Sequence, residues 1–264
     1  MLMAVKNQIK VSLLTVKYAT MRAMLNKTTF LTNVLFMILN NATFLIQWII
    51  LFSLKEDVGG YTFKQVILLW GIAANTYGIS RFFFDKAFCL SDVINQGKLD
   101  AYLVQPKNVL ISAITADISV SALGDIIYGY ILLCIYGITV QAFILFTLFS
   151  ICGGFILASL SVILSSLSFW FSKSDSITDT ANSMMTHFAT YPDGIFKGIT
   201  KIILYTIIPV GLVNYIPVRV ITKFEWRTFL TTIGGTIIFV ILAFTIFYRG
   251  LRKYSSSNLM IAKI

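Results

Sequence analysis

Long apolar runs alternate with short polar segments along almost the whole chain. Five runs, 30–54, 63–84, 109–137, 142–171 and 228–248, are dominated by Leu, Ile, Phe and Val. A helix needs about 20 consecutive apolar residues to cross the hydrocarbon core of a bilayer. Each run reaches that length, so we predict a membrane-spanning helix at each of them.

The segment before the last of these runs is harder to assign. Residues 175–191 are too polar to face lipid, and the apolar run that follows, 196–221, is interrupted by Pro209 and Pro217. Proline breaks helices, and irregular backbone at membrane depth is tolerated only inside protein or along a water-filled cavity. Either 175–191 is a protein-enclosed span followed by a re-entrant loop, or 200–217 is the fifth span. Both alternatives give six spans.

Two shorter segments have apolar residues on one face only. In residues 1–28 an apolar residue recurs every three or four positions between basic residues, which predicts an amphipathic helix on the membrane surface. In 91–106 Gly97 suits the left-handed position after a helix end, and Leu99, Tyr102 and Leu103 then recur at helical spacing. We expect one or two short surface helices there, with apolar side chains offered to a soluble partner.

Composition and charge narrow the class of protein. Of the 264 residues 57% are hydrophobic and 12% charged, with a mean hydropathy of +0.83, whereas soluble domains carry about 25% charged residues. The net charge of +10 could indicate nucleic acid, but the basic residues flank apolar runs. If the N-terminus lies in the cytoplasm, fourteen of the 21 Lys and Arg residues are cytoplasmic. Five are in the N-terminal segment, four in the loop after the second span and four in the C-terminal tail, and the fourteenth is Lys173. This excess agrees with the usual enrichment of basic residues on the cytoplasmic side. We therefore expect a single transmembrane domain with both termini in the cytoplasm and no nucleic-acid partner.

Familiar catalytic and nucleotide-binding motifs are absent from the sequence. It contains no GxxxxGK[ST], HExxH or GxSxG, and its single histidine, His187, has no evident metal partners. Two functions that use ionisable side chains stay open at this point. Asp117 and Asp125, within the predicted third span, could carry protons in a secondary transporter. His187 with Asp175 or Asp179 could serve an intramembrane enzyme.

Small residues recur in the fourth span at helical spacing. Ser150, Gly154 and Ala158 stand four residues apart. Such a stripe lets helices approach closely in lipid. It fits an interface between subunits and packing within the chain equally well.

The order of these segments resembles a known family. The chain has a G-x-L-x-x-x-L-x-x-P element at 97–106, I-P-V at 208–210 and N-Y-x-P at 214–217, followed by a last span with a basic tail. This order, over nearly the whole chain, is similar to that of the permease subunits of type-2 ABC exporters, in their bacterial branch. The strongly polar segment 175–191 departs from the family pattern.

The resemblance implies an all-α polytopic membrane protein with six transmembrane helices in a bacterial plasma membrane. Residues 1–28 would be an interfacial connecting helix, 175–191 the fifth span, and 196–221 an outer re-entrant hairpin. The implied coupling helix, 91–106, would dock into a separate cytoplasmic ATP-binding subunit, which would bind ATP and Mg and hydrolyse the ATP. This chain would bind no cofactor or metal itself, and would pair with a second copy or a homologous permease.

The same resemblance marks out residues for particular roles. Coupling to the ATPase would involve Ile94, Gly97, Leu99, Tyr102, Leu103 and Pro106. The translocation path would be lined by the polar faces of the second and fifth spans, at Asn75, Tyr77, Ser80, Asn182 and His187. The re-entrant hairpin would depend on Pro209, Asn214 and Pro217.

Overall fold

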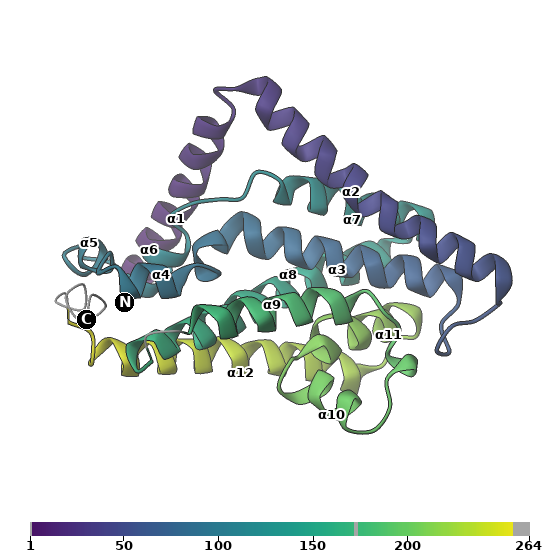
Figure 1. Ribbon diagram of the computed structural model, residues 1–264. Coiled ribbons are helices and arrows are strands. Elements are labelled where there is room, and N and C mark those ends of the chain that lie inside the picture. The colour runs from purple at the N-terminus through teal and green to yellow at the C-terminus, as the bar shows by residue number, and fades with distance from the viewer. Residues whose placement is uncertain (1, 172–173, 256–264) are drawn as a thin grey trace.

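The computed structural model describes residues 2–171 and 174–255, and these form a bundle of helices (Figure 1). The longer helices are α1 (Leu2–Ala23), α2 (Lys27–Leu54), α3 (Phe63–Phe84), α7 (Ala122–Tyr136), α8 (Val140–Ser165), α9 (Asp175–Ala189) and α12 (Trp226–Leu251). The shorter ones are η1 (Asp85–Ala87), α4 (Leu90–Asn95), α5 (Asp100–Leu103), α6 (Val109–Ile114), η2 (Ser166–Phe169), η3 (Asp193–Ile195), α10 (Gly198–Thr206), η4 (Gly211–Tyr215) and α11 (Ile216–Thr222). Below, the α5 end of the bundle is the end that carries α4, α5 and α6, and the α10 end is the opposite one (Figure 1).

Helix α3 lies in the core of the bundle, between α7 and α8. It begins at a capping box, in which Thr62 accepts a hydrogen bond from the Gln65 amide and the Gln65 side chain accepts one from the Thr62 amide. Half of its 22 residues are buried. It approaches α7 closely because glycines face each other, and a Cβ added to Gly129 would lie 2.8 Å from the Gly71 carbonyl oxygen. This pass is therefore surrounded by protein and not by lipid.

The stripe of small residues in α8 packs within the chain. Ser150, Gly154 and Ala158 are buried, and a Cβ added to Gly154 would lie 2.9 Å from the side chain of Ile79 in α3. Of the two interpretations of this stripe, packing within the chain is the one that the structure supports.

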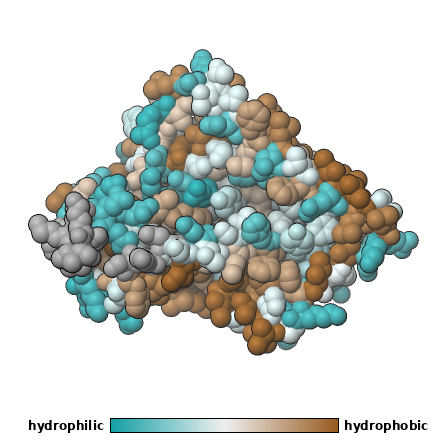
Figure 2. Space-filling model, in the orientation of Figure 1, coloured by the Kyte–Doolittle hydropathy of each residue, from teal (hydrophilic) through white to brown (hydrophobic). Residues whose placement is uncertain are grey.

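Helices α2 and α12 form the apolar outside of the bundle. Only 6% of the apolar stretch of α2 and 11% of that of α12 are buried, and the brown surface in Figure 2 runs over α12 and the far end of α2. Exposed side chains include Leu35 and Phe36 of α2 and Ile241 of α12. Such a surface is stable only against lipid or another apolar surface, because apolar area in water costs free energy.

The number of helices that can cross a membrane is smaller than the sequence predicts. Among the described residues four helical stretches are long and apolar enough, Lys27–Leu54, Phe63–Asn95, Val140–Phe169 and Trp226–Leu251, and the bent pair of α10 with η4–α11 counts as a fifth if taken as one span. Helices α7 and α9 have 15 residues each, about 22 Å, which is shorter than the hydrocarbon core of about 30 Å. Six spans therefore stay a prediction.

The predicted third span, 109–137, is not one helix. It is divided into α6 and α7 by a break at residues 115–121. Within the break the Asp117 carboxylate pairs with Arg22 at 2.8 Å and with Lys86 at 3.7 Å. The Ser119 amide donates to the Arg81 carbonyl at 3.2 Å. The prediction of a continuous helix was wrong because of these contacts with residues distant in sequence. They supply a hydrogen-bond partner for the backbone and opposite charges for the carboxylate, so the segment is stable without being helical.

Helix α1 begins at the α5 end of the bundle (Figure 1), and its buried side carries Gln8 together with Val16 and Ala19. Gln8 donates to Ser112 at 3.3 Å and accepts from the Asn108 amide at 2.9 Å, and Ser12 accepts from Thr115. The exposed side carries large apolar residues, among them Ile9, Leu13, Tyr18 and Met21. The basic side chains of the described part of α1 are exposed as well. An exposed face with both apolar and basic residues fits a helix that lies in the bilayer interface.

The Pro-interrupted region bends at one proline and not at the other. Pro209 lies at the break between α10 and η4, where the two arms are bent by 75°. Pro217 stands in the first turn of α11, and the helical path from Gly211 to Thr222 continues through it. The expectation that both prolines break a helix was therefore wrong for Pro217, because the first turn of a helix needs no amide donor from that residue.

Candidate functional site

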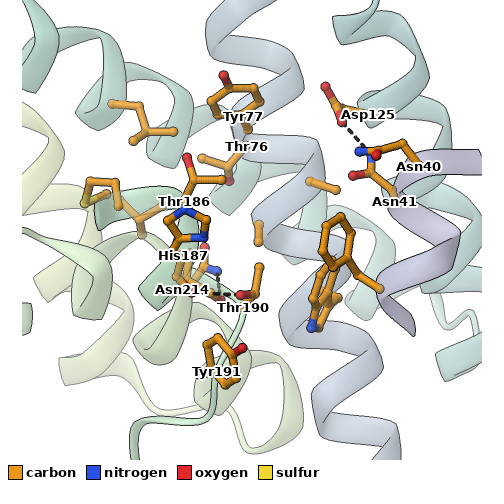
Figure 3. Close-up of a pocket in the computed structure, with 18 of the residues that line it drawn as sticks. Asn40, Asn41, Thr76, Tyr77, Asp125, Thr186, His187, Thr190, Tyr191 and Asn214 are labelled. Carbon is orange, nitrogen blue, oxygen red and sulfur yellow. Dashed lines mark hydrogen bonds between the residues drawn. The ribbon is translucent and has the colours of Figure 1, made fainter. Parts of the chain in front are cut away.

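A cavity of about 350 Å³ opens between α2, α3, α7 and α9 (Figure 3). Figure 3 shows residues of α2 and α7 on one side of α3 and residues of α9 on the other. Polar groups and aromatic rings share its wall. The polar residues are Asn40, Asn41, Gln47, Thr76, Asp125, Thr186, His187, Thr190 and Asn214, and the aromatic ones are Phe44, Trp70, Tyr77 and Tyr191.

The acidic group of the cavity is Asp125, in the first turn of α7. Its side chain is only 4% exposed, and its Oδ1 accepts a hydrogen bond of 2.6 Å from the Asn41 amide. Asn41 is in turn held by Tyr128, whose hydroxyl donates to the Asn41 carbonyl at 3.2 Å. The second carboxylate oxygen, Oδ2, is buried and has no hydrogen-bond partner among the described residues.

The opposite wall is set by an irregular helix. Asn214 and Tyr215 belong to the π-helical turn η4, a geometry often found at functional sites. The Asn214 amide donates to the Ala189 carbonyl and the Tyr215 hydroxyl to the Phe188 carbonyl, each at 2.7 Å. These two bonds occupy carbonyls in the last turn of α9, and the Phe188 carbonyl also accepts from the Tyr191 backbone amide at 3.4 Å.

A second hollow of about 460 Å³ continues from the cavity toward the α5 end. The two share Tyr77, Thr186 and His187. The remaining wall of the second hollow consists of Arg81, Phe88, Cys89, Asp179, Asn182 and Ser183. Together they form a polar groove between α3 and α9, which appears as the pale and teal band across the middle of Figure 2.

The residues expected to line a path divide into two groups. Tyr77, Asn182 and His187 lie in the walls of the groove, and the Asn182 side chain accepts a hydrogen bond from Ser161 at 2.9 Å. Asn75 and Ser80 have no exposed surface. They face α7 and α8, since Asn75 packs on Gly129 and Ser80 lies beside Gly154. Neither residue lines the cavity or the second hollow, whereas Thr76 and Asn214, which are also buried, border the cavity.

The two acids of the predicted third span lie in different surroundings. Asp117 lies in the break between α6 and α7, is partly exposed, and forms ion pairs with Arg22 and Lys86. Asp125 is buried inside the bundle and bonds to Asn41. Only Asp125 is therefore a buried acid, and the two carboxylates do not face one cavity.

The coupling element is anchored by some of its predicted residues and exposed at others. Gly97 joins α4 to α5 with a φ of +69°, as the left-handed position predicts. Ile94 and Leu99 have no exposed surface and anchor the element on the bundle. Their side chains therefore cannot contact another protein. The exposed tip consists of Leu103, Val104, Gln105, Pro106 and Lys107, with Tyr102 partly buried behind it. The exposed apolar surface of the element therefore lies toward its end.

Of the acids suggested as partners of His187 in enzyme chemistry, the described residues place only the side chain of Asp179. His187 and Asp179 both border the second hollow without a hydrogen bond between them in the described part of the chain. The side chain of Asp175 lies outside the described residues. No group of three His, Cys, Asp or Glu suited to a metal ion is found among the residues that the structure covers.

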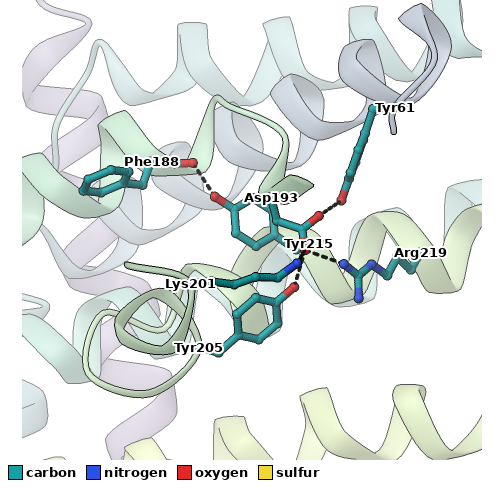
Figure 4. Close-up of polar contacts among 7 residues, drawn as sticks. All are labelled: Tyr61, Phe188, Asp193, Lys201, Tyr205, Tyr215 and Arg219. Atoms are coloured by element: carbon teal, nitrogen blue, oxygen red, sulfur yellow. Dashed lines mark hydrogen bonds and ion pairs between the residues drawn. The ribbon is translucent and has the colours of Figure 1, made fainter. Parts of the chain in front are cut away.

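A second polar cluster, at the α10 end, was not anticipated from the sequence (Figure 4). Asp193 is 2% exposed and accepts hydrogen bonds from Tyr61 at 2.9 Å, from Tyr205 at 2.8 Å and from Arg219. Lys201 lies 3.4 Å from the same carboxylate. Burial disfavours the charged carboxylate, but the bonds from Tyr205, Tyr61 and Arg219 outweigh it, so the pKa of Asp193 lies below its usual value.

This Asp193 cluster joins segments that are far apart in the sequence. It ties the 55–62 loop to η3, α10 and α11, and the backbones also meet directly, since a Cβ added to Gly194 would lie 1.9 Å from the Gly59 carbonyl oxygen. No motif predicts it, because Tyr61 and Asp193 alone are 132 residues apart.

The all-helical bundle, its apolar exterior and its polar internal groove define a multi-pass membrane protein with the architecture of a transport component. The chain belongs to a family described as ABC-2 family transporter protein, whose sequence model matches residues 38–258. That match covers every helix from α3 to α12 and most of α2. Neither the curated proteins nor the solved structures contain a match to the chain.

Proposed function

We propose that this chain is the membrane-spanning permease of an ATP-driven exporter, with six passes and both termini in the cytoplasm of a bacterial cell. The observation that carries the proposal is the family match over residues 38–258, together with a polar groove inside a membrane bundle. In this arrangement α9 is the fifth pass, and the bent α10–α11 pair is a re-entrant hairpin at the outer end of the groove.

ATP would be bound and hydrolysed, with Mg, by a separate cytoplasmic subunit that docks on the tip of the α4–α5 element. The support is the geometry of that element. Its base is buried through Ile94 and Leu99, while Leu103 is 43% and Val104 84% exposed at the tip. An element whose base is packed on the bundle can transmit a conformational change from a partner bound at its apolar tip, whereas a solvated loop would move without displacing the bundle.

A second permease, either a copy of this chain or a homologue, would complete the path. The support is the polar outer side of α9, where Asp179, Thr180, Ser183 and Thr186 are exposed. Such groups are costly against lipid. A second subunit facing α9 would exclude lipid and enclose the groove between two polar walls.

The test is docking of the ATP-binding subunit, measured by co-purification from native membranes. Val104→Glu puts a charge on the proposed apolar contact, and Val140→Glu is the matched control, since Val140 is 78% exposed at the opposite end of the bundle, where α8 begins. We expect Val104→Glu to lose the ATPase from the purified complex and to abolish substrate-stimulated ATP hydrolysis, while Val140→Glu retains both. Retention of the ATPase by Val104→Glu would refute the docking assignment, and transport by the purified chain without any ATPase would refute the proposal as a whole.

A further inference from the structure

The cavity between α2, α3, α7 and α9 has a charge balance that favours one class of ligand. Asp125 is the single acidic residue in its wall, and no lysine or arginine stands among the described residues that line it. Arg81, in the neighbouring hollow, is already engaged, since it lies 3.3 Å from the Asp85 carboxylate and 4.7 Å above the Phe88 ring. The negative charge of Asp125 is therefore balanced by no cation within the cavity.

Two buried acceptors in this wall lack partners. Asp125 and Asn214, 4% and 0% exposed, each have one side-chain oxygen that is buried without a hydrogen-bond partner among the described residues. An unpaired buried acceptor costs roughly 1–3 kcal/mol, and a buried carboxylate costs more unless a positive group approaches it. A ligand that carries positive charge would offset the cost of the Asp125 carboxylate.

The rest of the wall is suited to the same ligand. Phe44, Trp70, Tyr77 and Tyr191 surround the cavity, and the Phe44 and Trp70 rings stack with centroids 5.9 Å apart. Aromatic faces attract cations, more strongly where water is excluded. The α9 helix also ends at Ala189 in this wall, and the negative end of a helix dipole favours positive charge.

We propose that this cavity binds a lipophilic organic monocation, with Asp125 as its counter-charge and the aromatic residues as its apolar surround. The ligand would be carried along the groove, so the assignment of substrate class rests on the transport function proposed above. A strongly hydrated metal ion fits less well, because Asp125 is the single carboxylate among the described residues of the wall and such ions usually take several charged oxygen ligands.

The test is equilibrium binding to the purified chain in phosphatidylcholine nanodiscs without an ATPase. The probes are tetraphenylphosphonium and tetraphenylborate, which have nearly the same size and opposite charge, and binding to empty nanodiscs is subtracted. We expect saturable binding of tetraphenylphosphonium only. Asp125→Asn should weaken it by about thirtyfold, and Asp57→Asn, an exposed acid in the loop before α3, should leave it unchanged.

A second pair of variants covers the case in which Asp125→Asn does not fold. Phe44→Leu removes a ring from the cavity wall and should weaken tetraphenylphosphonium binding by about three- to tenfold. Phe36→Leu removes an exposed ring from the same helix outside the cavity and should have no effect. Equal binding of tetraphenylborate, or unchanged binding by both cavity variants, would overturn the proposal. Because no ATPase is present, those results would leave the docking experiment as the separate test of the exporter function.

Discussion

The Asp193 cluster offers a direct measurement of what holds the α10 end together. Tyr61 and Asp193 are 6% and 2% exposed and share a bond of 2.9 Å. A hydrogen bond to a charged group contributes about 1.5–3 kcal/mol, and burial of both partners leaves little screening by water. Arg219 and Lys201 are 52% and 44% exposed, so each of their ion pairs contributes less than about 1 kcal/mol.

We therefore expect Tyr61→Phe to lower the free energy of unfolding by about 2 kcal/mol. Asp193→Ala should lower it by about 3–5 kcal/mol, since the tyrosines and the arginine then lose a buried partner. In the Asp193→Ala background Tyr61→Phe should cost almost nothing, which gives a coupling energy of about 2 kcal/mol for the pair. The assay is reversible unfolding in mixed micelles of a mild detergent and dodecyl sulfate, followed by tryptophan fluorescence.

The control for this cycle is Tyr18→Phe, which removes a hydroxyl from a tyrosine that is 63% exposed in α1. It should change the free energy of unfolding by less than about 0.5 kcal/mol. A coupling energy between Tyr61 and Asp193 below about 0.5 kcal/mol would refute the reasoning, because the bond would then not contribute beyond what water offers.

Two further predictions use the same unfolding assay. Because the pKa of Asp193 is lowered in the folded chain, its contribution is present above the usual carboxyl value of about 3.9 and is lost as the pH falls through the lowered value. Stability measured between about pH 3 and pH 7 should therefore fall at the acid end in the parent chain and fall less in Asp193→Asn; parallel curves would contradict this. Leu99→Ala should cost about 2–5 kcal/mol because Leu99 is fully buried, whereas Leu103→Ala, at a side chain 43% exposed, should cost less than about 1 kcal/mol; equal costs would mean that Leu99 does not anchor the element.

The sequence predicted those parts of the fold that depend on local pattern. Hydropathy located α2, α3, α8 and α12 to within a few residues, and Gly97 and Pro209 stand at a turn and a bend as expected. These features follow from helix length, glycine freedom and proline chemistry, which neighbouring residues determine.

The wrong predictions concern which side of a helix is buried against other helices and which side is exposed. Asn75 and Ser80 look like a polar lining, but close packing on Gly129 and Gly154 turns them inward. Leu99 looks like an exposed contact because its spacing matches Leu103, yet it is the anchor. A hydrophobic period gives one face of a helix but not the identity of the surface that covers it.

The break in the third pass was missed for a related reason. Its segment contains neither proline nor glycine, and its stability comes from Arg22 and Lys86, of which Arg22 is 95 residues away from Asp117. The sequence places Asp125 within a predicted span, but its partner Asn41 lies on another helix. Pairings of this kind depend on the packing of whole helices, which one sequence without relatives does not reveal.

The hydrogen bond between Gln8 of α1 and Asn108 also limits when α1 can pack on the bundle during synthesis. Asn108 leaves the ribosome 100 residues after its partner Gln8, about 5–20 seconds later at usual rates of synthesis. During that interval the polar side of α1 has only water and headgroups to bond with, while its apolar side already favours the lipid. Helix α1 would therefore wait at the membrane surface until α6 has been synthesised.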